Sequence, residues 1–316
     1  MNLKKPKFWD FRKPNIYAYI LLPISNILQL LKLFKNKSKT KLKIKTICVG
    51  NIYLGGTGKT SLSIKINKLL AQKNIKSCFI KKFYKDQLDE QKLLSTYGKL
   101  FSSHSRLEAL KQAENENYEV AILDDGLQDE SISHTLSFIC FNNINWIGNG
   151  FTIPAGPLRE KISILKNYNH VFLNGNLENS ENLTDKLKQI NPNIIIHLGK
   201  YEPINLEQFS IDDKYIAFSG IGNHDTFISM IKKSGLSILK EIEFPDHYSY
   251  SEKDINDILI EAQKFNCKII TTEKDFGRLE TYFGSKELFY LPITMGFLEK
   301  KEAIEFEALI TNSIKN

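Results

Sequence analysis

The sequence predicts an α/β protein made of two lobes and preceded by a hydrophobic helix. Short β-branched runs alternate with helical patterns along the chain, which is typical of parallel strands joined by crossover helices. A glycine-rich turn lies between one of these runs and the helical pattern after it, as in sheets that bind a nucleotide at their edge. Polar stretches at residues 166–169 and 174–185 predict a boundary between the lobes near residue 168.

The composition is that of a globular protein. The chain has 316 residues, of which 42% are hydrophobic and 25% charged, and it contains no Pro-rich or Ser-rich tract that would indicate disorder. Its four cysteines are far apart and form no CxxC pair: they are Cys48, Cys78, Cys140 and Cys267. We therefore expect reduced cysteines in the core, and neither a zinc site nor a disulfide framework.

Residues 1–40 are expected to form a membrane-associating segment. The first 45 residues contain twelve Lys or Arg and one acidic residue, a net charge of +11, while the whole chain carries +7 and the remainder therefore −4. A nucleic-acid-binding protein usually carries its basic residues on the folded domain, whereas here they flank an apolar run. This distribution predicts an anionic membrane surface as a partner and no binding of nucleic acid.

The apolar run covers residues 16–34 and contains one charge, Lys32. It is borderline for a transmembrane helix, which needs ~20 apolar residues. Because proline is tolerated at the start of a helix but not in its interior, Pro23 predicts that the helix begins near Ile24. From there apolar residues recur at helical spacing, which favours a helix in the membrane interface over one that spans the bilayer. A signal peptide is disfavoured because no small-residue cleavage site follows the run.

The first lobe is expected over residues 41–168 and a second, smaller α/β lobe over residues 169–316. The first contains β-like runs at 46–50, 77–82, 118–124 and 136–141 and helical patterns at 58–73 and 104–116. The second contains β-like runs at 170–173, 193–198, 214–220, 267–272 and 287–292 and helical patterns at 223–234 and 251–265. We expect the second lobe to close over an active site on the first.

The segment LGGTGKT, residues 54–60, has the sequence of a phosphate-binding loop. It follows a predicted strand and opens a predicted helix, so backbone N–H groups and the positive end of the helix would converge on a polyphosphate. Tyr53 stands where the pattern GxxxxGK[ST] requires its first glycine, which leaves a glycine turn with a fortuitous Lys-Thr pair as the alternative. The strand and helix around the loop favour a P-loop NTPase-like lobe. The expected nucleotide-binding residues are Gly55, Gly56, Thr57, Gly58, Lys59 and Thr60.

Asp124 and Asp125, at the end of the run 118–124, are the predicted metal ligands. Adjacent carboxylates at the end of a strand can hold Mg²⁺ opposite the Thr60 hydroxyl, although Asp-Asp-Gly is otherwise simply a turn. The segment Thr272-Glu273-Lys274-Asp275 is similar to a guanine-reading box, but its lysine comes one residue late. We therefore expect ATP rather than GTP.

Several motifs together resemble one family, the LpxK tetraacyldisaccharide 4′-kinases (lipid A 4′-kinases), over nearly the whole chain. They are VGNIYLGGTGKT (49–60), LDDGLQ (123–128), GNGFTIPAGPLRE (148–160), AFSGIGN (217–223), FPDHYSYS (244–251) and TTEKD (271–275). A hydrophobic N-terminal helix is also a feature of the family. The resemblance implies transfer of the ATP γ-phosphate to the 4′-hydroxyl of a membrane-embedded tetraacyl disaccharide 1-phosphate, giving lipid IVA. It further implies an enzyme at the cytoplasmic face of the bacterial inner membrane, and no obligate protein partner is inferred.

The resemblance also implies roles for residues that match the family motifs. Lys59 would contact the β and γ phosphates, and Thr60, Asp124 and Asp125 would surround Mg²⁺. Arg159 would stabilise charge on the transferring phosphoryl group. Glu160 also matches its motif in full and is a further active-site candidate.

Two other family motifs are incomplete in this chain. The GDEP box is matched by LDEQ, which keeps Asp89 and Glu90, and the DHH box by DHY, which keeps Asp246 and His247. Glu90 and Asp246 are further active-site candidates, like Glu160. The SRGYG stretch of the family is replaced by KKFY at residues 81–84.

The resemblance implies that Asp89 accepts the hydroxyl proton and that His247 orients its carboxylate. In the expected lobes Asp89 lies in the first and His247 in the second, so this pair would join them. Two alternatives remain at this stage. One is a membrane-bound regulatory P-loop NTPase, and the other is a degenerate family member without catalysis.

Overall fold

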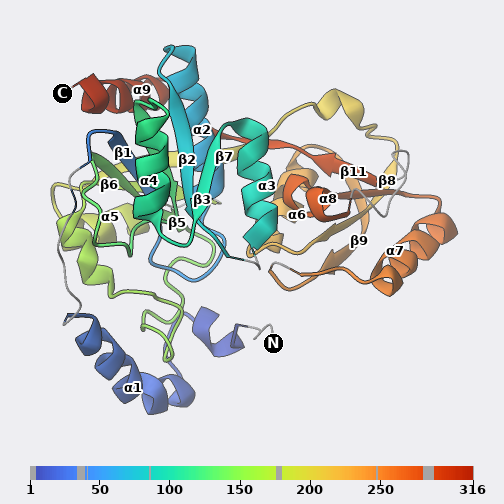
Figure 1. Ribbon diagram of the computed structural model, residues 1–316. Helices are drawn as coiled ribbons and strands as arrows, with labels where there is room; N and C mark the ends of the chain where they lie inside the picture. The colour runs from blue at the N-terminus through green and yellow to red at the C-terminus, as the bar shows by residue number, and fades with distance from the viewer. Residues whose placement is uncertain are drawn as a thin grey trace. The chain divides into compact units, whose positions relative to one another are not determined.

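The protein forms two compact units in the computed structural model, which describes residues 5–33, 40, 42–84, 87–175, 180–246, 248–279 and 288–315. The first unit comprises residues 1–82, 101–200 and 297–316, and the second unit residues 83–100 and 201–296. Each unit has a sheet of its own with helices packed on it (Figure 1). The predicted α/β fold class is confirmed.

Among the described residues, eight strands form the larger sheet, most of which belongs to the first unit, in the order β12-β7-β6-β5-β1-β4-β2-β3. The pairs β1–β4, β1–β5, β2–β4, β5–β6 and β6–β7 are parallel. Because β1 lies between β4 and β5, the loop at its carboxyl end borders the ends of both neighbours. The strands are β1 (Lys45–Gly50), β2 (Ser77–Lys82), β3 (Leu100–Ser103), β4 (Val120–Asp124), β5 (Leu136–Asn142), β6 (His170–Asn174), β7 (Ile195–Pro203) and β12 (Ile293–Phe297).

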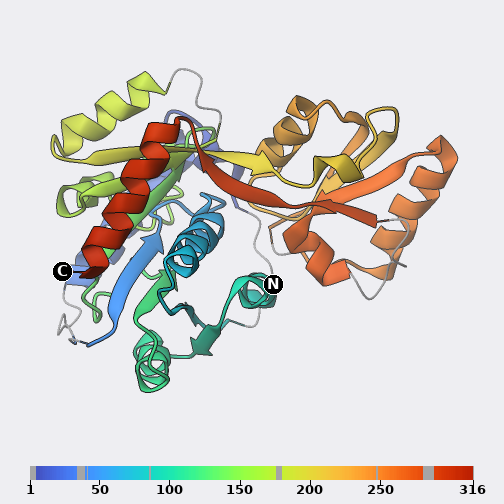
Figure 2. The same ribbon diagram turned by 90° about the horizontal axis from the view of Figure 1, so that it is seen from above.

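Helices cover both faces of this sheet. Successive side chains of a strand point to opposite faces. In β5, Ile139 packs in a cluster with Leu187 of α5, whereas its neighbour Phe138 packs against Phe306 of α9. α2 lies beside α9 (Figure 2), and α4 packs against β2. These helices are α2 (Lys59–Gln72), α4 (Arg106–Asn115), α5 (Glu181–Ile190) and α9 (Lys300–Lys315).

The described part of the second unit contains a four-stranded parallel sheet in the order β11-β10-β8-β9. In β8, Ala217 packs with Ile231 of α6, whereas Phe218 packs with Ile258 of α7, so the two helices lie on opposite faces. The strands are β8 (Lys214–Ser219), β9 (Ser237–Glu243), β10 (Lys268–Thr272) and β11 (Leu288–Leu291). The helices are α3 (Leu88–Tyr97), α6 (His224–Lys233), α7 (Glu252–Phe265) and α8 (Glu273–Leu279).

The two units differ from the lobes expected at 41–168 and 169–316. β6 pairs with β5 and β7 pairs with β6, so both strands extend the sheet of the first unit rather than start the second. The polar stretch at 166–169 is therefore only the end of a connection between neighbouring strands. Residues 83–100 belong to the second unit, because α3 packs against α8.

The N-terminal helix α1 (Ile16–Leu33) contains Pro23 in its interior, so the predicted start near Ile24 is wrong. The helix is capped by Asn15, whose side-chain oxygen accepts a hydrogen bond from the Ala18 N–H at 3.1 Å. This cap, together with the contacts of α1 described below, outweighs the local cost of an interior proline. In the part of the chain that the structure describes, a helix with the length and apolar character needed to cross a bilayer is not found.

Candidate active site

The glycine-rich loop joins β1 to α2 in the first unit, as the sequence predicts. Gly58 caps α2 with a φ of +83°, and Gly55 has a φ of +150°. Residues other than glycine rarely adopt these backbone conformations. The side-chain amide of Asn51 donates hydrogen bonds to the carbonyl of Tyr53 at 2.7 Å and to Oγ1 of Thr57 at 2.8 Å. These hydrogen bonds within the loop fix its conformation, and the N-terminus of α2 follows directly. That combination can bind a polyphosphate.

Tyr53, which replaces the first glycine of the motif, anchors the loop to the N-terminal segment. Its side chain is buried, and its hydroxyl donates to Asp10 at 2.6 Å and accepts from Nζ of Lys5 at 2.9 Å. The ring packs so closely on Gly55 that a Cβ there would lie 2.9 Å from it. Tyr53 therefore leaves no space for a side chain at position 55, and the loop keeps its conformation with the tyrosine in place.

Asp124 lies at the end of β4, and the parallel pairing of β1 with β4 brings it beside the start of α2. Its carboxylate is fully buried. Oδ2 accepts a hydrogen bond from Thr60 at 3.4 Å, and Oδ1 accepts one from Ser63 at 3.2 Å. Nζ of Lys81, at the end of β2, lies 2.6 Å from Oδ2. The predicted metal ligands Thr60 and Asp124 are thus brought together.

Asp125 lies among positively charged groups. Its Oδ1 accepts a hydrogen bond from Nη1 of Arg159 at 2.7 Å and lies 3.9 Å from Nζ of Lys59, while Arg106 donates to its carbonyl at 2.6 Å. Burial by itself would raise the pKa of Asp125, but Lys59 and Arg159 outweigh it and lower the pKa to about 2. Asp125 is therefore ionised at neutral pH. It holds Lys59 and Arg159, two of the predicted phosphate-binding side chains, in one place.

The segment that carries Arg159 is fixed to the glycine-rich loop by backbone hydrogen bonds. The N–H of Arg159 donates to the carbonyl of Ile52 at 2.6 Å, and that of Leu54 donates to Pro157 at 2.8 Å. Gln128 bridges the two segments: its Nε2 donates to the Asn51 carbonyl at 2.9 Å, and its Oε1 accepts from Arg159 at 3.2 Å. The motifs at 49–60, 123–128 and 148–160 therefore form a single site.

Glu160 follows Arg159 in the chain, and its neighbours include Lys32 and Gln128. Burial raises the pKa of Glu160, although Lys32, on α1, opposes this shift. The carboxylate is thus adjacent to the phosphate site, next to the N-terminal helix.

The polar side chains of α1 contact this same segment, and its apolar side chains face outward. Ser25 donates to the Thr152 carbonyl at 2.8 Å, while Gln29 and Lys32 donate to the Arg159 carbonyl at 3.3 and 2.7 Å. The exposed apolar side chains are Ile16, Tyr17, Tyr19, Ile20, Ile24, Ile27, Leu28, Leu30 and Leu31. The outward side chains of α1 are therefore mainly apolar, and an exposed apolar surface of this extent is typical of an interaction site.

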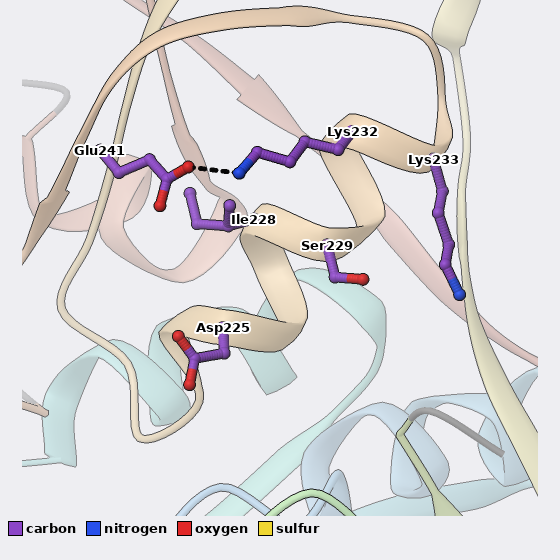
Figure 3. Close-up of a pocket in the computed structure, with 6 residues that line it drawn as sticks. All are labelled: Asp225, Ile228, Ser229, Lys232, Lys233 and Glu241. Atoms are coloured by element: carbon purple, nitrogen blue, oxygen red, sulfur yellow. Dashed lines mark ion pairs between the residues drawn. The ribbon is translucent and has the colours of Figure 1, made fainter. Parts of the chain in front are cut away.

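A cavity of about 700 Å³ opens between α1 and the site. It is lined by Leu28, Gln29, Leu31, Lys32, Gln128, Ile153 and Arg159, and therefore combines leucine and isoleucine side chains with two cations. A second hollow, of about 530 Å³, lies on the surface of the second unit between α6 and β9, where Lys232 and Glu241 form an ion pair (Figure 3). It contains none of the predicted site residues.

The site has donor groups suited to Mg²⁺, although the described residues contain no group of three or more His, Cys, Asp or Glu placed to hold a metal by themselves. A nucleotide-bound Mg²⁺ takes most of its ligands from phosphate and water, so one hydroxyl and one carboxylate are enough. Thr60 and Asp124 supply that pair. The residues present therefore fit a Mg²⁺–nucleotide complex.

The second unit brings together three other predicted residues around Lys274. Asp89 lies 3.2 Å from Nζ of Lys274, Glu90 lies 3.1 Å from it, and Asp246 lies 3.6 Å from it. Burial by itself would lower the pKa of Lys274, but the carboxylates of Glu90, Asp246 and Asp89 raise it. Arg278 also contacts Asp89, at 2.5 Å. His247 lies outside the described residues.

This arrangement corrects the expected location of Asp89. The sequence places Asp89 in the phosphate-binding lobe, but α3 belongs to the second unit, the unit that also contains Asp246. It also explains the segment that is similar to a guanine-reading box, because Lys274 forms ion pairs with carboxylates of its own unit.

The family model for LpxK, tetraacyldisaccharide-1-P 4′-kinase, matches residues 17–99 and 89–314. The chain belongs to this family. The tetraacyldisaccharide 4′-kinase of Pelagibacter ubique (strain HTCC1062) is 56% identical over 302 residues, which cover 95% of this chain and 96% of that protein. The same enzyme of Rickettsia canadensis (strain McKiel) is 34% identical over 296 residues, covering 87% of this chain and 88% of that protein.

A solved structure of LpxK from Aquifex aeolicus in complex with ATP covers 95% of this chain and 100% of that one, with a TM-score of 0.67. The two sequences are 22% identical, so this likeness supports the fold. The family resemblance predicted from the motifs is confirmed by the family model and by the relatives.

The sequence did not indicate several side chains of this LpxK-family site. Asn51, Gln128 and Asn174 are amides that hold the loop, the last by donating to the Thr57 carbonyl at 2.8 Å. Amides at strand ends occur in many proteins, so their spacing carries no signal. Lys81 does have a signal in the sequence, because a lysine that directly follows the apolar residues Phe79 and Ile80 of a predicted strand requires a partner of opposite charge.

Proposed function

We propose that this chain transfers the γ-phosphate of ATP to the 4′-hydroxyl of a tetraacyl disaccharide 1-phosphate, forming lipid IVA. As a member of the tetraacyldisaccharide 4′-kinase family, the chain is an ATP-dependent lipid-sugar kinase of lipid A biosynthesis. The observation that supports the assignment to particular residues is the meeting of Lys59 and Arg159 at Asp125, beside the glycine-rich loop.

Lys59 and Arg159 are proposed to bind the phosphates of ATP. A polyphosphate attracts both cations more strongly than one carboxylate does, so it competes with Asp125 for them. Thr60, Asp124 and Asp125 are proposed to hold Mg²⁺. When bound there, Mg²⁺ would neutralise negative charge on the phosphates. The glycine-rich loop and the start of α2 contribute N–H donors to the same groups.

Asp89 is proposed to accept the proton of the 4′-hydroxyl, with His247 orienting its carboxylate. The proposal rests on the match of LDEQ and DHY to family motifs, and the ion pairs of Asp89 support it. Lys274 and Arg278 hold the Asp89 side chain in place through these ion pairs, and a carboxylate held in place can accept a proton.

The lipid substrate is proposed to enter beside α1. The cavity there combines Leu28, Leu31 and Ile153 with Lys32 and Arg159, which suits a molecule with acyl chains and a phosphate.

We also propose that α1 lies in the interface of an anionic membrane, at the cytoplasmic face of the inner membrane. Its outward side chains are apolar, and the first 45 residues carry a net charge of +11. Ile20→Glu or Ile24→Glu should reduce binding to anionic vesicles by about tenfold, because a charge replaces inserted apolar surface. Ile304→Glu, at an exposed position of α9, is the matched control. Equal binding by all three variants in a flotation assay would contradict the proposal.

The function is tested by incubating the full chain with ATP, Mg²⁺ and tetraacyl disaccharide 1-phosphate in mixed micelles. We expect a bisphosphorylated lipid, separable from the substrate by mass. A regulatory NTPase would instead hydrolyse the nucleotide without changing the lipid, and a degenerate member would do neither. Either result would rule out the proposed function.

A further inference from the structure

Lys81 is a buried lysine at the edge of the phosphate site. It is the residue before the last in β2, which pairs in parallel with β4 through Ile80 and Leu123, so it lies next to Asp124. Its side chain is 2% exposed and that of Asp124 is 0% exposed, with 2.6 Å between Nζ and Oδ2. Each of these charges is stable in the interior only beside the other. The pair therefore holds Asp124 as a fixed carboxylate.

The carboxylate oxygen that contacts Lys81 is also the one that faces the predicted metal ligand Thr60. Oδ2 of Asp124 accepts from Thr60 at 3.4 Å, while Oδ1 is held by Ser63 at 3.2 Å. A cation that binds Asp124 on the side of Thr60 must therefore share its oxygen with a lysine ammonium group. The positive charge of Lys81 opposes such a cation and attracts an anion in the same place.

The other charges of the site point in the same direction. Lys59 and Arg159 lie 3.9 and 2.7 Å from Asp125. Within the ion pairs of the described residues, these two cations and Lys81 therefore exceed the carboxylates Asp124 and Asp125 by one positive charge. The two aspartates are thus already compensated by the protein. A polyanion can then bind without a metal ion to cancel their charge.

We propose that Lys81 is a positioning residue of the phosphate site: it fixes Asp124 beside Thr60, and its charge makes ATP binding less dependent on Mg²⁺. The inference rests on the proposed nucleotide site. A purely structural ion pair would affect stability and leave the metal dependence of binding unchanged. If the charge of Lys81 acts on the nucleotide, removing that charge changes how strongly ATP binding depends on Mg²⁺.

The measurement is the ratio of two dissociation constants of ATP for the full chain, one in EDTA and one with Mg²⁺, obtained by calorimetry. Lys81→Gln keeps a hydrogen-bond donor for Asp124 but removes the charge. We expect it to raise the ratio by about tenfold, because metal-free ATP loses a cation that Mg²⁺ then replaces. Lys81→Arg keeps the charge and should restore a ratio within about twofold of the unchanged protein. Lys111→Gln, at an exposed lysine of α4, controls for net charge.

A second pair of variants covers the case in which Lys81→Gln fails to fold. Asp124→Asn is compared with Lys81→Met/Asp124→Asn. The double variant contains no buried charge at these two positions, and in the single variant the phosphates of bound ATP replace Asp124 as the counter-ion of Lys81. We expect the double variant to bind ATP in EDTA about tenfold more weakly than the single one.

The results separate two kinds of failure. An unchanged ratio in Lys81→Gln, or equal affinities in the second pair, would overturn the role of Lys81 alone. If the unchanged protein bound ATP in neither buffer, the proposed nucleotide site would be wrong, and this inference with it.

Discussion

The site of the first unit and the cluster of the second unit combine charged side chains in opposite proportions. In the first, Lys59, Lys81 and Arg159 surround the carboxylates Asp124 and Asp125. In the second, Lys274 and Arg278 lie among the carboxylates Asp89, Glu90, Asp246 and Asp275. The described charges of the first site therefore sum to a positive value, and those of the second to a negative one.

The opposite charges of the two sites suit two different tasks of a kinase. Surplus positive charge binds and stabilises the phosphates, whereas surplus carboxylate serves to accept a proton from a hydroxyl group. It also explains why the sequence identifies the two sites unequally. A phosphate loop needs glycines and a lysine at fixed spacing, but a carboxylate cluster can be built from residues far apart.

The largest expected effect tests the first site. Lys59→Ala should lower kcat/KM by about 10⁴-fold, because a cation that binds the transferring phosphoryl group is lost. The melting temperature should stay within a few degrees, since Lys59 lies at the start of α2 and its ammonium group points to Asp125 in the site, 3.9 Å away. Lys111→Ala controls for the loss of one surface charge. Activity near that of the unchanged protein would show that the loop does not hold ATP.

The next effect tests whether the second cluster supplies the base. Asp89→Asn should lower kcat by about 10³-fold, with little change in KM for ATP, because it removes a proton acceptor and not a phosphate ligand. His247→Ala should act through the same step, so the double variant should be hardly slower than Asp89→Asn alone. Strictly additive losses would show that the two residues act independently.

Glu90→Gln is the matched control for that assignment. Glu90 neighbours Asp89 and shares its partner Lys274, so its loss removes an equal charge from the cluster. It should keep most of the activity. If Glu90→Gln were inactive and Asp89→Asn active, the match of LDEQ to the family motif would be shifted by one residue.

The fold was predictable from sequence where the signals are local. Alternating β-branched runs and helical patterns gave the α/β class, and the loop at 54–60 was found because its spacing is fixed by backbone geometry. The assignment of α3 to the second unit was not predictable. The chain leaves the first unit at residue 83 and returns to it at residue 101, and no local pattern marks so short an excursion. The pairing of Asp89 with Lys274 depends on that excursion and was equally hidden.

A smaller effect concerns the stability of the second cluster. Lys274→Met should lower the free energy of unfolding by about 3 kcal/mol, because Asp89 and Glu90, which are mostly buried, lose the cation that they share. Lys268→Met breaks an exposed ion pair with Asp213 in the same unit, and should cost less than about 1 kcal/mol. Urea unfolding measures both. Equal losses would mean that the cluster around Lys274 is as well solvated as the surface.

The smallest effect concerns a pair of buried histidines in the first unit, remote in sequence from the phosphate loop. Nδ1 of His170 lies 3.2 Å from Nε2 of His197, and both rings pack against Phe138, with Phe306 against His197. Burial lowers the pKa of both, and the neighbouring His170 contributes to lowering that of His197 to about 4. Between an unfolded value of about 6.5 and this folded value, the unfolded chain binds more protons than the folded one.

The stability contributed by His197 is therefore complete above about pH 6.5 and is lost as the pH falls toward 4. At pH 5 the loss should be on the order of 2 kcal/mol relative to pH 7.5. His197→Phe should remove that part of the pH dependence, while His104→Gln, at an exposed histidine, should keep it. Carboxylates of both units also titrate below pH 6, so the quantity to compare is the difference between the variants in urea unfolding at the two pH values. If His197→Phe and the unchanged protein lost equal stability, the acid sensitivity would come from the carboxylate clusters and not from the histidine pair.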